Sequence, residues 1–348
     1  MERKLATIRK IKEIKPIKDA DKIELAIIDG WQCVVKKGEF KEGDFAIYFE
    51  IDSLLPTIPE FDFLANKGVK TNADGSTGYR LKTIKLRGEI SQGLLLPLST
   101  FKLYNVIEGD DLTEILNIKK YEPAISAQLQ GQVRGNFPGF LRKTDAERIQ
   151  NIYGKYRHVY SDSKWEVSEK LNGTSATFYI KDGEFGVCSR NLDLKETEGN
   201  TYWKIAREYK LEEFLKKSSG NFSIQGEIIG EGIQKNPLKI IGQQLRIFNV
   251  FDIDKSEYLP YLDRISFVQS LALFLYQDTV KWVDIHVPIL NEEALKVFDL
   301  PVEVLLEEAD GKSKINSKVD REGLVFKNLL NPNINFKTIS NKYLLKHE

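Results

Sequence analysis

Short β-rich segments separated by turn residues fill the first third of the chain, and they constrain its fold more than any other feature. The segments span residues 31–35, 45–49, 79–86 and 93–97, with Gly38, Gly43 and Gly88 between them. Segments rich in β-branched and aromatic residues that end at glycine turns are typical of strands. Strands at this spacing in a small module predict an OB-like β-barrel over residues 1–122. A structural barrel without a ligand is the alternative.

The composition changes after this module. Gly131, Gly135, Pro138 and Gly139 interrupt any periodicity, and few apolar residues accumulate. We therefore expect a linker over residues 123–140. Basic residues in and just after it leave two interpretations open, a contact with a phosphate backbone and a solvated hinge.

Residues 141–348 mix helix and strand patterns in irregular order. Helical periodicity spans residues 201–217, 264–276 and 292–309, the last with a possible break at Pro301. Strand patterns span residues 165–170, 174–180, 184–189, 222–229, 245–253, 323–327 and 334–337. This order predicts an α+β domain of antiparallel sheets flanked by helices.

The composition excludes several classes of protein. Lys and Arg together number 51 and so do Asp and Glu, so bulk positive charge cannot hold the chain to nucleic acid, although a local basic groove is still possible. Two cysteines and three histidines are too few for thiolate or histidine metal sites. Carboxylates would have to hold any metal, which favours magnesium or manganese. Without a long apolar run or a secretory signal, we expect an intracellular, cytoplasmic protein that does not enter membranes.

Lys170 and Gly173 form a short motif at the end of a predicted strand. Such a motif is weak evidence alone, because Lys85, Lys217 and Lys239 also precede a glycine by three positions. Charged and aromatic residues follow Lys170 in a fixed order: Arg190, Glu227, Phe251 with Asp252, Glu322 with Lys327, and Lys337. Each one alone is best explained as an ordinary structural residue. Together, in this order, they are much harder to explain as unrelated structural residues.

This ordered set resembles the covalent nucleotidyltransferases, the superfamily of ATP-dependent ligases and mRNA capping enzymes. The N-terminal barrel, the segment 144–151 and the segment 226–236 are similar to those of RNA ligases with an N-terminal OB module, the Deinococcus and Naegleria type. The resemblance covers most of residues 141–348, which would form the adenylyltransferase domain.

The resemblance assigns a role to each residue of the set. It implies that Lys170 attacks ATP and carries AMP, that Glu227 and Glu322 hold Mg²⁺ or Mn²⁺, and that Lys337 lowers the pKa of the Lys170 amine. The nucleotide would also contact Glu169 through the adenine amino group, Phe251 by stacking, Arg190 at the ribose or phosphate, and Asn172, Gly173, Lys327 and Arg148.

Two positions depart from the pattern of the superfamily. DNA ligases and capping enzymes usually have aspartate where this chain has Asn172, and the last motif commonly has a second lysine where this chain has Asn335. If these changes abolished adenylylation, a catalytically impaired nucleic-acid-binding protein would be the better interpretation.

The resemblance implies an RNA ligase that joins 5′-phosphate and 3′-hydroxyl ends at nicks in RNA-containing duplexes, through lysyl-AMP and an adenylylated end. We expect it to act as a monomer. The alternatives within the superfamily are a DNA ligase and an mRNA guanylyltransferase. We expect neither, because the short stretch after Lys337 leaves no room for the C-terminal OB domain that those enzymes carry.

Overall fold

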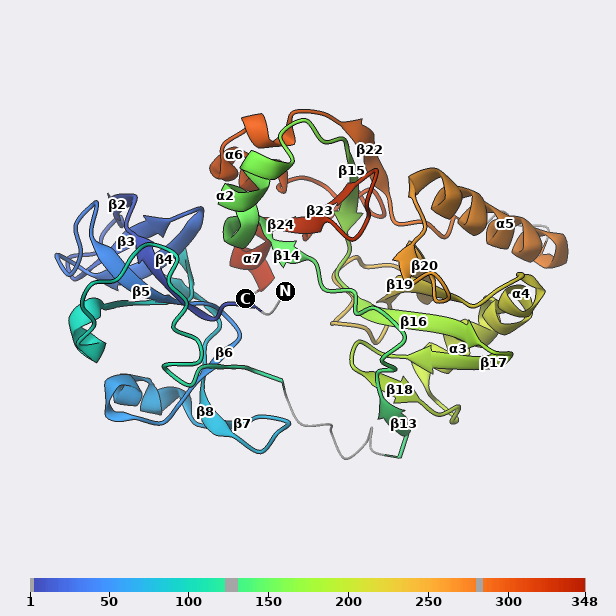
Figure 1. The fold of residues 1–348 in the computed structure, drawn as a ribbon, viewed down its shortest axis with the longest axis horizontal. Coiled ribbons are helices and arrows are strands. Elements are labelled where there is room, and N and C mark those ends of the chain that lie inside the picture. The colour runs from blue at the N-terminus through green and yellow to red at the C-terminus, as the bar shows by residue number, and fades with distance from the viewer. Residues whose placement is uncertain (1–2, 123–130, 280–283, 348) are drawn as a thin grey trace. The chain divides into compact units, whose positions relative to one another are not determined.

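The computed structural model describes residues 3–122, 131–279 and 284–347. The chain forms two compact units, one of residues 1–126 with 344–348 and one of residues 127–343 (Figure 1). Part of the predicted linker, residues 123–130, lies outside the described residues.

The described strands of the first unit form four small sheets. The first sheet has the order β1 (Ala6–Lys10), β5 (Phe45–Phe49) and β11 (Leu94–Pro97), and the second has the order β2 (Glu13–Pro16), β3 (Ile23–Ile28) and β4 (Trp31–Lys36). The third has the order β12 (Lys119–Lys120), β6 (Ser53–Leu55), β8 (Thr77–Arg80) and β7 (Lys70–Thr71). The fourth pairs β10 (Glu89–Gln92) with β9 (Thr83–Leu86). The 3₁₀-helices η1 (Pro59–Lys67) and η2 (Leu98–Phe101) connect strands.

Strand β5 contributes side chains to both apolar clusters of this unit. Ile47 and Phe49 pack into a cluster with Phe61, whereas Ala46 and Tyr48 pack into a second cluster on the other face. A strand buried on both faces must be continuously apolar, which accounts for the unbroken run in the sequence. The predicted strand 79–86 is instead two strands, β8 and β9.

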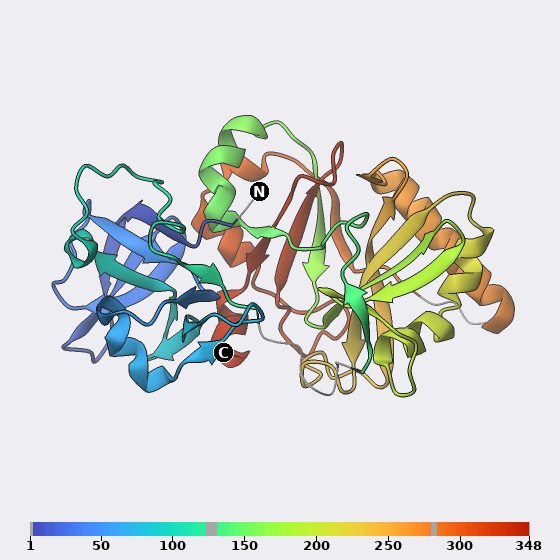
Figure 2. The ribbon, with the colours of Figure 1, turned by 60° about the horizontal axis from the view of Figure 1, so that its bottom comes forward.

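The second unit contains two larger sheets (Figure 2). The seven-stranded sheet has the order β13 (Val133–Asn136), β18 (Leu192–Leu194), β17 (Glu184–Cys188), β16 (Thr174–Lys181), β19 (Phe222–Gly230), β20 (Gln243–Asp252) and β21 (Glu257–Tyr258). The five-stranded sheet has the order β14 (Glu147–Arg148), β24 (Asn335–Ile339), β23 (Gly323–Asn328), β15 (Trp165–Lys170) and β22 (Ile289–Ala294).

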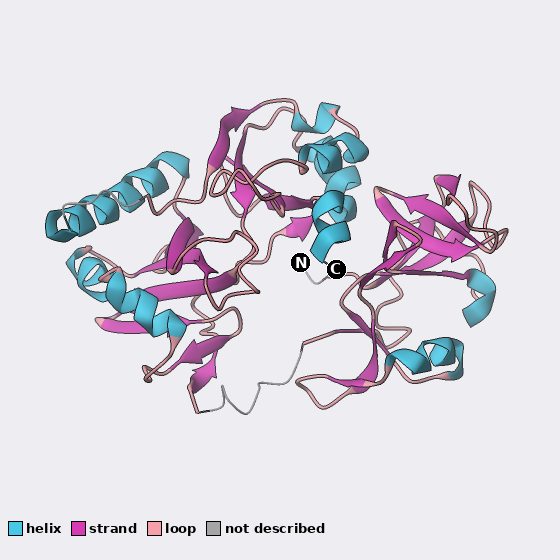
Figure 3. Cartoon of the chain, turned by 180° about the vertical axis from the view of Figure 1, so that it is seen from behind, coloured by secondary structure: helices cyan, strands magenta, loops and turns pink. Residues whose placement is uncertain are grey.

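Helices cover one face of each sheet (Figure 3). Helices α3 (Thr201–Glu208), α4 (Leu211–Lys217) and α5 (Tyr261–Thr279) pack on the seven-stranded sheet. Helices α2 (Ile149–Val159) and α6 (Val302–Glu308), with η3 (Val297–Asp299), pack on the five-stranded sheet, and α7 (Asn341–His347) follows β24. The predicted α+β class is confirmed. Within the described residues, no helix is long and apolar enough to cross a membrane.

Two predicted helices differ from the structure. The helix predicted over residues 201–217 is broken in two, because Lys210 adopts a left-handed conformation with φ of 46°. The segment 292–309 begins as the end of strand β22, and its helix starts only after Pro301, at Val302. Pro301 is the N-cap of this helix, where its missing N–H removes no hydrogen bond from the helix.

Trp165 anchors the core between the five-stranded sheet and its helices. The ring is fully buried and lies 5.1 Å from the ring of Phe336 and 5.6 Å from that of Phe298. We predict that Trp165→Ala lowers the free energy of unfolding by about 3–5 kcal/mol, measured by urea denaturation with circular dichroism. The control Tyr104→Ala, at a ring that is 81% exposed, should change it by less than about 0.5 kcal/mol. A Trp165→Ala loss as small as the control's would contradict this packing account.

Candidate active site

The chain passes from one sheet of the second unit to the other between Lys170 and Thr174. Lys170 is the last residue of β15 in the five-stranded sheet, and Thr174 is the first of β16 in the seven-stranded sheet. Gly173 lies so close to β19 that a Cβ there would be 2.4 Å from the Ile228 carbonyl oxygen and 2.8 Å from Cγ of Glu227. The glycine of the motif is therefore required by a close approach of backbone to strand.

Lys170 and Glu322 form an ion pair in this crossing. The Lys170 Nζ lies 2.7 Å from Glu322 Oε1, and both side chains are partly buried. The strand register explains the pair, because Lys170 is opposite Gly323 in the ladder between β15 and β23. Glu322 immediately precedes Gly323, so the ladder places its side chain next to the Lys170 amine.

Glu227 places a second carboxylate at the same site. Burial raises its pKa to about 7, and the negative charge of Glu322 adds to the rise. Lys170, Arg190 and the Gly173 N–H oppose the shift. A carboxylate that is hard to ionise in this way would be stabilised by a cation bound beside it.

Lys337 contributes a cation from β24. Burial, followed by the charges of Lys170 and Arg148, lowers its pKa to about 8. Arg148 is opposite Lys337 in the parallel ladder between β14 and β24. Three positively charged groups thus gather at one end of the five-stranded sheet, where they would attract phosphate.

Arg190 lies at the edge of this group. It follows β17, its guanidinium Nη2 donates to Asp145 Oδ1 at 2.6 Å, and its side chain is exposed. Its charge nevertheless lowers the pKa of Glu227. Arg190 therefore adds positive charge at the edge of the site.

Glu169 is buried. It precedes Lys170 in the sequence, so its side chain lies on the other face of β15. Its Oε2 accepts a hydrogen bond of 2.7 Å from the Lys314 N–H, and burial raises its pKa. Its Oε1 has no hydrogen-bond partner among the described residues, and the same holds for Asn172 Oδ1 and Glu322 Oε2. These three buried oxygens near Lys170 could each accept a hydrogen bond from a ligand or bind a cation.

Two predicted nucleotide contacts lie apart from the others. Phe251 is only 1% exposed, and Tyr258 covers it with ring centroids 5.1 Å apart, so no face is free for a base. Lys327 is also buried, and its Nζ donates to the Phe248 carbonyl oxygen. The structure therefore does not support stacking by Phe251 or a direct phosphate contact by Lys327.

Phe248 is the aromatic residue that sequence reasoning missed. It is partly buried and packs against a cluster that contains Leu171 and Ile229. The choice of Phe251 came from the resemblance, which does not show that β20 contains a bulge. Phe248 has no partner in the ladder between Asn249 and Ile247. An extra residue in a strand reverses which side chains share a face.

Asn335 takes no part in the group of cations. Its amide donates to the carbonyl oxygens of Pro332, at 3.0 Å, and Asn333. Lys337 is therefore the one residue of the last motif that reaches the site, among the residues the structure describes.

The carboxylates fit a hydrated cation better than a cage made only of protein. In the described part of the chain, no three His, Cys, Asp or Glu side chains are grouped as metal ligands. Glu227 and Glu322 supply two carboxylates, and Glu322 Oε2 is buried without a partner among the described residues. Magnesium typically binds through one or two carboxylates, water and substrate phosphates.

Comparison with known proteins identifies the class to which this fold and site belong. An OB-fold domain model matches residues 5–98, and an RNA ligase model matches residues 163–344. No curated protein matches the chain.

Three solved structures of Naegleria gruberi RNA ligase are 46% identical to the chain. A variant with ATP and Mn has a TM-score of 0.83, a form with PPi 0.82, and a variant with AMP and Mn 0.83. In all three, the match covers 99% of this chain and 99% of the other. The chain belongs to the RNA ligase family. The predicted class, an RNA ligase with an N-terminal OB module, is confirmed.

The close packing around Gly173 means that even a methyl group at this position should destabilise the fold. We predict that Gly173→Ala lowers the free energy of unfolding by about 1–3 kcal/mol, because the methyl group displaces β19 or the Glu227 side chain. Gly154→Ala, in helix α2 with open space around it, should leave stability unchanged or raise it by up to about 1 kcal/mol. Urea denaturation measures both. Equal stabilities for the two variants would contradict the close approach.

Proposed function

We propose that the chain is an ATP-dependent RNA ligase that joins 5′-phosphate and 3′-hydroxyl ends through AMP bound to Lys170. One observation carries the proposal. The Lys170 Nζ lies 2.7 Å from Glu322 Oε1 at the crossing between the two sheets, and the charged group of Lys337 is nearby. Structures of the similar Naegleria ligase with ATP, AMP, PPi and Mn support it.

In the first reaction the Lys170 amine attacks the α-phosphorus of ATP. A bond forms between nitrogen and phosphorus, the bond to the β-phosphate oxygen breaks, and pyrophosphate leaves. The amine must first lose its proton, and Glu322 Oε1 is the acceptor within hydrogen-bond reach. Lys337 places a second positively charged group near this amine.

The cationic groups would hold the phosphates of the nucleotide. Lys337, Arg148 and Arg190 would neutralise charge on the α-phosphate and on departing pyrophosphate. Bound Mg²⁺ or Mn²⁺, held by Glu227 and Glu322, would supply further neutralisation of the same charge. Asn172, whose Oδ1 is buried without a partner among the described residues, would contribute an acceptor near Gly173.

The adenine would lie beside Glu169 and Phe248. Glu169 Oε1 is a buried acceptor that lacks a partner within the described residues, as an exocyclic amino group requires. Phe248 offers a partly buried ring next to Leu171, and this ring replaces Phe251 as our candidate for base stacking.

Two further reactions would complete the joining of ends. AMP passes from Lys170 to a 5′-phosphate, and a 3′-hydroxyl then attacks that phosphate and releases AMP. We propose nicked RNA-containing duplexes as substrates, bound by residues 1–122. Residues 123–140 would connect this module to the transferase domain of residues 141–348, although residues 133–136 of the connection pair with the sheet of that domain as β13. The enzyme would act as a monomer in the cytoplasm, where its two free, buried cysteines would stay reduced.

Covalent labelling with α-labelled ATP and Mg²⁺ or Mn²⁺ tests the proposed chemistry. We predict that ATP labels the chain, that GTP does not, and that Lys170→Ala abolishes labelling without loss of fold. The control Lys155→Ala, at an exposed position of α2, should label normally. GTP labelling would instead support guanylyltransferase activity, and a labelled Lys170→Ala protein would refute the assignment. Labelling that appears only in Asn172→Asp would mean that Asn172 disables the first reaction.

Removal of the N-terminal module separates adenylylation from joining. We predict that a chain without residues 1–120 still accepts AMP from ATP, because the residues assigned to that reaction lie in the second unit. Its rate of joining nicked duplexes should fall by at least about tenfold, since backbone contacts by the module would be lost. Unchanged joining of nicked duplexes would rule out a role for the module in substrate binding.

A further inference from the structure

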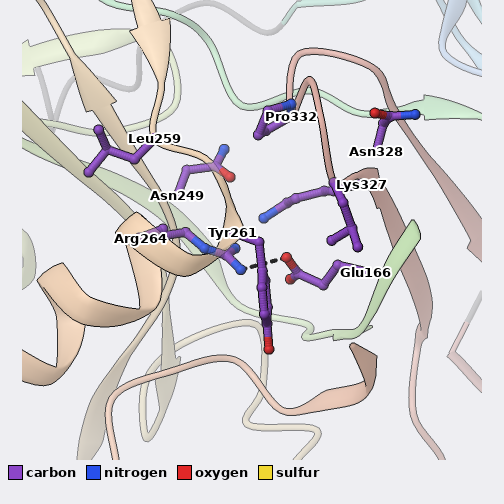
Figure 4. A pocket seen from close by; sticks show the side chains of 9 residues that line it. Glu166, Asn249, Leu259, Tyr261, Arg264, Lys327, Asn328 and Pro332 are labelled. Atoms are coloured by element: carbon purple, nitrogen blue, oxygen red, sulfur yellow. Dashed lines mark hydrogen bonds and ion pairs between the residues drawn. The ribbon is translucent and has the colours of Figure 1, made fainter. Parts of the chain in front are cut away.

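Three charged side chains are buried together away from Lys170. Glu166 on β15, Arg264 on α5 and Lys327 on β23 are 2%, 3% and 6% exposed. They point toward one another in Figure 4. Arg264 Nη2 and Glu166 Oε2 form an ion pair at 2.5 Å. None of the three has a role in the chemistry proposed above.

The cluster is costly for the fold. Two cations and one anion are removed from water, and burial together with the charge of Arg264 lowers the pKa of Lys327 to about 7. Apolar residues of similar volume often stabilise a protein as much as buried ion pairs do. Stability alone therefore gives little reason for three charges here.

Both cations donate to one backbone atom. Arg264 Nη1 lies 2.5 Å from the carbonyl oxygen of Phe248, and Lys327 Nζ donates to the same oxygen. Phe248 is the residue left unpaired by the bulge in β20, so its conformation is not fixed by the ladder. Two charge-assisted hydrogen bonds fix it instead.

The cluster also joins the two sheets that form the site. Glu166 and Lys327 are opposite each other in the ladder of the five-stranded sheet. Phe248 belongs to the seven-stranded sheet, and Arg264 belongs to the helix that packs on it. Glu166 and Lys170 lie on the same face of β15, four residues and so about 13 Å apart. The contacts therefore set the separation of the sheets near the place proposed for adenine.

We propose that Glu166, Arg264 and Lys327 are positioning residues for ATP, which hold Phe248 at the bulge so that its ring contacts the base. This inference rests on the proposed function. It predicts an effect on nucleotide affinity that passes through the Phe248 ring, whereas a general structural role would impair the enzyme whether or not the ring is present.

A double-mutant cycle tests the proposal in the full chain. The variants are Lys327→Met, Phe248→Ala and the two combined, with Lys155→Met as the control at an exposed lysine. Unfolding temperatures verify that each variant is folded. The measurement is the rate of AMP labelling against ATP concentration, which separates the half-saturating concentration from the maximal rate.

Lys327→Met should raise the half-saturating ATP concentration about tenfold and leave the maximal rate within about twofold. In the Phe248→Ala background the same substitution should change it by less than about twofold, because the ring through which it acts is gone. An equal factor in both backgrounds, or no change in either, would overturn the proposal.

If Lys327→Met does not fold, the same cycle with Glu166→Gln replaces it, since glutamine keeps an acceptor for Arg264 but removes the charge. Loss of ATP affinity only when Phe248 is present supports the proposal, and any effect independent of Phe248 overturns it. A wild-type chain that ATP does not label would refute the proposed function itself. A labelled wild type with additive substitutions would refute the positioning role alone.

Discussion

The crossing of the chain from one sheet to the other at Lys170–Gly173 is the constraint on which the rest of the site depends. Gly173 permits a backbone approach to β19 that no side chain could enter, with Ile228 oxygen 2.4 Å from the place of a Cβ. The ladder between β15 and β23 then brings Glu322 to Lys170, and the ladder between β16 and β19 brings Glu227 opposite Ser175, two residues from Gly173. Carboxylates from distant parts of the sequence thus meet one amine.

Burial gives these groups their chemical character. The same loss of water raises the pKa of Glu227 to about 7 and lowers that of Lys337 to about 8. Each charged form is therefore less stable than in water, and a ligand that carries phosphates and a divalent cation would stabilise both. The site is built to be completed by such a ligand. In the cluster around Arg264 the buried charges have a different role. Arg264 and Lys327 both donate hydrogen bonds to a single carbonyl oxygen, that of Phe248 at the bulge of β20.

The sequence was sufficient where local pattern and residue order carry the information. The strand predicted over 165–170 matches β15, and the ordered set of residues after Lys170 carried the resemblance to the ligases. It was insufficient where tertiary contacts decide. The left-handed Lys210 divides one predicted helix, and burial beneath Tyr258 removes the Phe251 ring that the resemblance assigned to stacking. Lys327 lies in the expected strand, but the pattern could not show that Arg264 and the Phe248 carbonyl surround it.

The central claim is that the Lys170 amine, and no other nucleophile, takes AMP from ATP. The most direct measurement is peptide mass spectrometry of the wild-type chain after incubation with ATP and Mn²⁺, under alkaline conditions that preserve a bond between phosphorus and nitrogen. The account predicts AMP on the peptide that contains Lys170, with fragment ions that place it on that side chain, and its disappearance after pyrophosphate is added. AMP on a different residue, or none at all, would contradict the account.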